Sequence, residues 1–151
     1  DQFIEGKVEV EGEWAFDPEW SVTEWMGKDT WNRMKLDVFL KEAPNSCRIV
    51  DWKTGKKFGN EFKHGQQGQL YALGVFLRMP EMQFAKVEFI YTDHGQTLEK
   101  TYTREQAMVF LPKWTERAKK MTTCQEFLAK PSKQNCRWCS FRDNGCEWGI
   151  A

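Results

Sequence analysis

Two carboxylates and one amine are spaced so that neighbouring strands would bring them together. Asp51 and Lys53 flank Trp52, and side chains alternate along a strand, so both project from the same face. Asp37 precedes them, and the short turn between makes the two strands antiparallel neighbours. Carboxylates placed in this way can hold divalent ions that polarise a phosphodiester and activate water, while an ammonium orients that water. A surface Asp-x-Lys pair without a function is the alternative.

A second polar pair lies in the segment that follows. Gln67 and Tyr71 are four residues apart, which puts them on one face of a helix. We expect them to contact a DNA phosphate or to hold Lys53 in place. The alternative is an ordinary amphipathic helix, with Gln67 exposed to solvent and Tyr71 buried in the core.

Three of the five cysteines crowd near the C-terminus in the pattern C-x2-C-x6-C. The short spacing of Cys136 and Cys139 lets both thiolates reach one metal centre, and Cys146 can close it from the far side. An odd cysteine count without a visible signal sequence indicates a reducing compartment. Cys47 is expected to be a buried strand residue. The residues alone leave an iron–sulfur cluster, zinc and free thiols open.

The elements that would position these residues follow from periodicity and turn chemistry. Alternation predicts five strands, and helical spacing predicts a helix over Gln66–Met79 that Pro80 ends. Thr103 is the expected N-cap of a last helix that runs to about Met121 and that Pro112 kinks or divides. The order predicts an α+β or mixed α/β domain with one central sheet. The predicted strands are Lys7–Phe16, Thr30–Lys41, Cys47–Lys53, Phe84–Thr92 and Gln96–Thr103.

Composition agrees with a single globular domain over residues 1–151. The chain has 151 residues, 40% of them hydrophobic and 15% aromatic, with no net charge. Acidic residues dominate positions 1–36 and basic residues dominate 111–142, so the C-terminal third could supply phosphate contacts. No apolar run is long enough for a transmembrane helix. We expect no membrane partner and a cytoplasmic location, in a bacterium or a phage-infected host.

The segments 34–38 and 49–56 resemble the PD-(D/E)XK nuclease superfamily, in particular its RecB-like branch. The resemblance covers about residues 7–146 and implies a restriction-endonuclease-like core, with a central mixed sheet flanked by helices. It implies that Asp37 and Asp51 bind Mg²⁺ or Mn²⁺, that the Trp52 carbonyl is a further ligand, and that Lys53 is the catalytic lysine. The proline that names the motif is Leu36 here. Gln67 and Tyr71 match the branch's Q-x-x-x-Y motif and are expected to act in catalysis.

The cysteines extend this resemblance to the segment 131–148. Several exonucleases of the superfamily, including those of CRISPR spacer acquisition and certain helicase–nucleases, carry three C-terminal cysteines that bind a 4Fe-4S cluster. The resemblance implies such a cluster on Cys136, Cys139 and Cys146, with zinc as the alternative. The last gap is six residues here and commonly five in the family. The family's fourth ligand lies upstream of the nuclease motifs, and Cys124 is the nearest substitute in this chain.

One family feature is expected to be missing. RecB-like nucleases usually carry a helix before the first strand, with a His or an acid near the metals, whereas this chain begins almost at that strand. The two histidines are His64 and His94. His64 could approach the site from just before the motif helix, but we expect an exposed loop residue.

These observations predict a metal-dependent DNA nuclease, an exonuclease of recombination, repair or phage DNA processing. DNA is the expected partner, single- or double-stranded, and a helicase or recombinase is a further candidate. A catalytically inactive nucleic-acid-binding or scaffold module is the main alternative. A zinc-stabilised protein-interaction domain is a third interpretation, which leaves Asp37, Asp51 and Lys53 unexplained.

Overall fold

The computed structural model describes residues 7–149. The chain forms two compact units, Asp1–Ala118 and Lys119–Ala151. All of the predicted nuclease residues lie in the first unit, and four of the five cysteines lie in the second.

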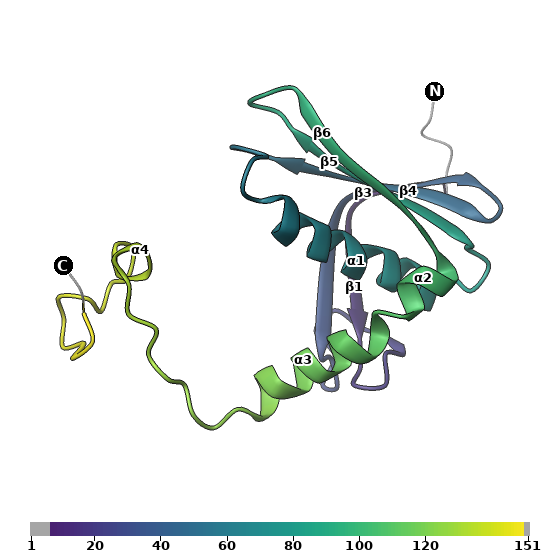
Figure 1. Cartoon of the computed structure of the whole chain (residues 1–151). Coiled ribbons are helices and arrows are strands. Elements are labelled where there is room, and N and C mark those ends of the chain that lie inside the picture. The colour runs from purple at the N-terminus through teal and green to yellow at the C-terminus, as the bar shows by residue number, and fades with distance from the viewer. Residues whose placement is uncertain (1–6, 150–151) are drawn as a thin grey trace. The chain divides into compact units, whose positions relative to one another are not determined.

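The first unit is built on a six-stranded mixed sheet with the order β2-β1-β3-β4-β5-β6 (Figure 1). All neighbours are antiparallel except β4 and β5, which are parallel. The five predicted strands are confirmed to within two residues at each end. Strand β2 was not predicted, because its two residues lie in a segment rich in turn residues that reads as a loop. The strands are β1 (Val8–Phe16), β2 (Val22–Thr23), β3 (Asn32–Ala43), β4 (Ser46–Lys53), β5 (Phe84–Tyr91) and β6 (Gln96–Thr103).

Helix α1 (Glu61–Arg78) makes the crossover that the parallel β4–β5 pair requires. It lies across one face of the sheet in Figure 1 and ends just before Pro80. Gly74 lets it approach closely, because a Cβ atom there would stand 2.6 Å from the sulfur of Met34 on β3. The helix begins five residues earlier than predicted, since Gly65 interrupts the helical signal.

Helices α2 (Arg104–Met108) and α3 (Leu111–Thr123) follow β6 directly. Thr103 caps α2, as predicted, and the cap is a capping box with Gln106. Pro112 stands at the start of α3. The guanidinium of Arg104 donates to backbone carbonyls at the C-terminal end of α1 and just beyond it. Its acceptors are the carbonyl oxygens of Phe76, Met79, Pro80 and Met82, at 2.8 to 3.0 Å.

The core lies between α1 and the sheet. Every second residue of β4 faces it, so Cys47 and Ile49 are buried there, as expected for Cys47. Burial, and then the negative charge of Glu42, raises the pKa of the Cys47 thiol to about 12. The same alternation carries Asp51 and Lys53 to the α1 side of the sheet. The fold class predicted from the sequence, an α+β domain with a mixed central sheet, is confirmed.

Candidate active site

Asp37 is held at the junction of β3 and β4. The two strands pair antiparallel up to Val38 and Val50. Beyond this pair, a hydrogen bond to the Asp37 side chain replaces the backbone hydrogen bonds between the strands. Its Oδ2 accepts a hydrogen bond of 2.8 Å from the backbone N–H of Trp52. This contact fixes the carboxylate beside the strand that carries the other two residues, as the sequence predicts.

Asp51 is the only buried charged residue within the described range 7–149, with 3% of its surface exposed. Its Oδ1 lies 2.6 Å from the ammonium of Lys53, which confirms that the two side chains share a face. The same ammonium lies 5.4 Å from the centre of the Phe89 ring on β5. A buried carboxylate without partners would cost several kcal/mol, so this pairing is what allows the charge to stay inside.

Gln67 and Tyr71 hold the other oxygen of Asp51. The Tyr71 hydroxyl donates to Asp51 Oδ2 at 2.7 Å, and Gln67 Nε2 lies 3.2 Å from the same atom. Burial, followed by the charge of Asp51, raises the pKa of Tyr71, so the phenol keeps the proton it donates. Gln67 Nε2 also donates to the Tyr71 hydroxyl at 2.6 Å, and that hydroxyl lies 3.2 Å from the Lys35 carbonyl oxygen. Within the described residues the pair thus holds Asp51 and not Lys53, as one expectation had it, while a contact to DNA stays a prediction.

His64 was wrongly expected to be an exposed loop residue. It is half-buried inside α1, its Nδ1 lies 2.6 Å from the Tyr91 hydroxyl, and its ring stacks on Phe89 at 5.5 Å. His64 precedes Gln67 by three residues and Tyr71 by seven, so one helical stripe carries all three. That spacing was the available signal, and it was missed because the helix was predicted to begin at Gln66. His94 lies exposed in the turn between β5 and β6.

The carboxylates suit a hard divalent cation. Asp51 Oδ1 is buried and accepts no hydrogen bond of good geometry, although the Lys53 ammonium is close. The carboxylate of Asp37 offers further oxygen ligands of the kind that such a cation prefers. No group of three His, Cys, Asp or Glu side chains in residues 7–149 is placed to hold a metal ion. Two carboxylates nevertheless fit Mg²⁺, which keeps several waters and relies on substrate phosphate for the rest of its coordination.

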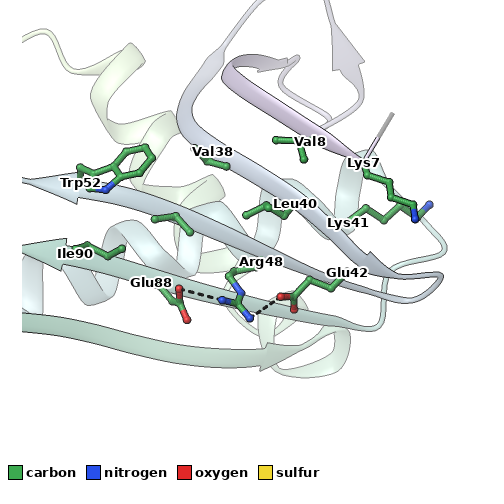
Figure 2. Close-up of a pocket in the computed structure, with 11 residues that line it drawn as sticks. Lys7, Val8, Val38, Leu40, Lys41, Glu42, Arg48, Trp52, Glu88 and Ile90 are labelled. Atoms are coloured by element: carbon green, nitrogen blue, oxygen red, sulfur yellow. Dashed lines mark ion pairs between the residues drawn. The ribbon is translucent and has the colours of Figure 1, made fainter. Parts of the chain in front are cut away.

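The opposite face of the sheet is separate from this site. Arg48 and Trp52 line a hollow of about 680 Å³ there, together with strand residues of β1, β3 and β5 (Figure 2). Arg48 pairs with Glu42 at 2.6 Å and with Glu88 at 3.7 Å. Because the Trp52 side chain belongs to this face, only its backbone can take part in the carboxylate site.

The cysteines of the second unit do not form the expected cluster. Cys136 is buried, Cys146 is half-buried and Cys139 is exposed, and all are free thiols. Cys124 is exposed, and its sulfur lies 2.9 Å from the carbonyl oxygen of Glu126. These four residues belong to no group with metal-ligand geometry in the described chain. The thiols as placed are therefore not gathered around one metal centre, and a shared iron–sulfur cluster or zinc ion would require the segment to rearrange.

One comparison with known proteins identifies a family. The model of the PD-(D/E)XK nuclease superfamily matches residues 34–144, which include Asp37, Asp51 and Lys53 and stop short of Cys146. No curated protein gives a significant match. Among solved structures, the crystal structure of SSO0001 aligns over 95% of this chain with 16% identity and a TM-score of 0.44. The chain spans 62% of the length of that protein.

No helix within residues 7–149 is long and apolar enough to cross a membrane.

Proposed function

The chain belongs to the PD-(D/E)XK nuclease superfamily, and from this premise we propose that it is a metal-dependent deoxyribonuclease that hydrolyses phosphodiester bonds. The observation that carries the proposal is the fixed, buried carboxylate of Asp51. Tyr71 and Gln67 hold one of its oxygens, and the Lys53 ammonium lies against the other. A carboxylate oriented on both sides needs little rearrangement during reaction, which is the condition for electrostatic preorganisation.

Each residue has a distinct part in this proposal. Asp37 and Asp51 would hold Mg²⁺ or Mn²⁺, the ions typical of this superfamily, with the Trp52 carbonyl as a further ligand. The bound ion would polarise the phosphate and lower the pKa of water. Lys53 orients the attacking water or donates to a phosphate oxygen, since an ammonium has three N–H groups and the ion pair with Asp51 can occupy only some of them. Tyr71 and Gln67 act through Asp51 as positioning residues.

The finer parts of the function rest on the resemblance in the motifs. We infer exonuclease action on single- or double-stranded DNA in recombination, repair or phage DNA processing, with a helicase or recombinase as a candidate partner. Metal binding by Cys136, Cys139 and Cys146, as a 4Fe-4S cluster or zinc, is supported by their spacing alone.

A cleavage assay tests the proposal. Labelled single- and double-stranded DNA is incubated with the protein in Mg²⁺, in Mn²⁺ or in EDTA. Lys53→Ala is compared with Lys86→Ala, a matched control on β5 whose ammonium pairs with Glu88 and Glu99. We expect cleavage by the wild type and by Lys86→Ala in either metal, and none by Lys53→Ala or in EDTA.

Two results would contradict the proposal. Equal cleavage by Lys53→Ala, or cleavage that persists in EDTA, would remove the metal-dependent site. DNA binding without cleavage under every condition would favour the non-catalytic binding module instead.

A further inference from the structure

His64 shares an aromatic ring with the proposed catalytic lysine. Its imidazole stacks on Phe89, with ring centres 5.5 Å apart and planes inclined by 27°. The Lys53 ammonium lies 5.4 Å from the centre of that same ring. The Phe89 ring therefore contacts both the Lys53 ammonium and the His64 imidazole. This imidazole has no part in the roles assigned to the site residues Asp37, Asp51, Gln67 and Tyr71.

Tyr91 determines which nitrogen of His64 carries the proton. Tyr91 is fully buried, and its hydroxyl lies 2.6 Å from Nδ1 of His64, its only hydrogen-bond partner among residues 7–149. If the phenol accepted from Nδ1, its own proton would be buried without a partner. The phenol therefore donates, Nδ1 accepts, and the proton of the neutral imidazole resides on Nε2.

The surroundings keep both partners neutral. Burial, followed by the positive charges of Lys53 and Lys63, lowers the pKa of His64, against smaller opposing effects of Asp51 and Glu61. Burial raises the pKa of Tyr91, followed by the charges of Glu61 and Asp51. A neutral imidazole with a neutral phenol is the pair that the hydrogen bond requires.

The Nε2–H group is left with no hydrogen-bond partner in the described part of the chain, although His64 is half-buried. A donor that stands beside two lysines suits an anionic oxygen. We propose that His64 is a further DNA-contacting residue, whose Nε2–H donates to a phosphate oxygen of the strand bound at Lys53. This inference rests on the proposed nuclease function, because that function brings a phosphodiester to Lys53.

Binding measurements can isolate this single donor. Tyr91→Phe removes the hydroxyl and keeps His64, whereas the double variant Tyr91→Phe with His64→Phe removes both members of the pair and keeps an aromatic ring at each position. Replacing both partners of a hydrogen bond by apolar groups of the same shape changes stability little. Fluorescence anisotropy with a fluorescein-labelled single-stranded oligonucleotide and with its duplex, both in EDTA, gives Kd without cleavage.

We expect the double variant to bind roughly 10- to 100-fold more weakly than Tyr91→Phe, as for the loss of one hydrogen bond to a charged group. The slope of log Kd against log salt should stay the same, because a neutral donor releases no counterion, whereas Lys63→Ala should reduce it if that lysine contacts phosphate. Equal Kd values for Tyr91→Phe and the double variant would overturn the inference.

A second pair of variants covers the case in which the double variant does not fold. His64→Gln restores an amide N–H donor, and His64→Met matches its length without one. Tighter binding by His64→Gln supports the inference, and equal binding by the two variants overturns it. Cleavage by Lys53→Ala in Mg²⁺, measured in parallel, separates the two proposals. If Lys53→Ala cleaves like the wild type, the nuclease site is wrong, whereas an inactive Lys53→Ala with no effect of His64 refutes the DNA contact alone.

Discussion

The carboxylate site and the cysteine segment both have the spacing of metal ligands, yet only the carboxylate site is assembled. Asp37, Asp51 and Tyr71 come from β3, β4 and α1, which pack around one core, and hydrogen bonds within the protein orient each of them. The cysteines follow α3 on a segment whose only helix within residues 124–149, α4 (Lys133–Cys136), has four residues.

The second unit also buries little apolar surface. Several of its large hydrophobic side chains are exposed by more than half, namely Met121, Phe127, Leu128, Trp138, Phe141 and Trp148. With so little packing, the described residues of this unit, 119–149, do not bring the thiolates together. A metal bound there would itself supply the free energy that orders the segment, as in other small metal-binding units. Packing can thus preorganise one site, while the other would depend on its ligand.

The largest expected effect is at the packed site. Asp51→Asn and Asp37→Asn should each abolish detectable cleavage, because each removes a hard anionic ligand from the proposed cation site. Circular dichroism should show that both variants keep their secondary structure. Glu99→Gln on β6, whose carboxylate pairs with Lys86, is the matched control and should cleave normally. Wild-type cleavage by either aspartate variant would refute the two-carboxylate assignment.

The next effect tests whether hydrogen bonding preorganises Asp51. Tyr71→Phe should lower the cleavage rate about 10- to 100-fold, the usual consequence of losing a group that orients a metal ligand. It should also cost about 1–3 kcal/mol of unfolding free energy, because a buried carboxylate oxygen loses a donor. Chemical denaturation and initial rates measure the two effects. Tyr102→Phe, at a buried ring with no hydrogen bond to Asp51 in the described structure, should leave the rate unchanged, and a similar loss there would show a general packing effect.

The third prediction concerns the unassembled site. Protein purified without oxygen should carry iron and sulfide, with broad absorbance at about 400 nm typical of thiolate-bound clusters, and Cys136→Ser with Cys139→Ser should lose both. Cys47→Ala is the control, since that thiol lies in the core of the other unit. Stoichiometric zinc in colourless protein would support the alternative metal. Folded protein without metal would show that the four thiols are free.

The smallest expected effect is a pH dependence of stability that comes from the buried thiol of Cys47. The pKa of Cys47 is raised from 9.0 to about 12 in the folded protein, so the native state keeps a proton that the unfolded chain loses. Stability is therefore fully present below pH 9 and falls as the pH rises toward 12, by up to about 1.4 kcal/mol per pH unit. Denaturation of the wild type at pH 9 and pH 10 should show a steeper loss than that of Cys47→Ala. Equal slopes would contradict the buried, protonated thiol.

Local pattern predicted most of the first unit. The alternation along 47–53 was enough to place Asp51 and Lys53 on one face, because side chains of a strand must alternate. The N-cap at Thr103 and the division of the last helix near Pro112 are equally local, and both were predicted, whereas the capping box with Gln106 was not. The match of residues 34–144 to the superfamily agrees with the resemblance read from the motifs, while the RecB-like branch stays a prediction.

Contacts made only by tertiary packing were missed. Tyr71 and Asp51 are 20 residues apart, and nothing local shows that their hydrogen bond replaces one to Lys53. The pairing of His64 with Tyr91 spans 27 residues and depends on where α1 begins. The spacing of the cysteines shows that the thiolates could bind one metal. It does not show whether tertiary packing brings them together.

Arg104 has a consequence for genetics. It holds the end of α1 opposite to His64, and from position 64 to position 78 the helix extends about 21 Å at 1.5 Å per residue. Gln67 and Tyr71 lie on the same helix, α1. Loss of the hydrogen bonds from Arg104 would therefore let the whole helix shift or tilt against the sheet. A screen for impaired or restored cleavage should therefore recover mutations at Arg104, and suppressors at positions such as Met34, which packs against Gly74 of α1.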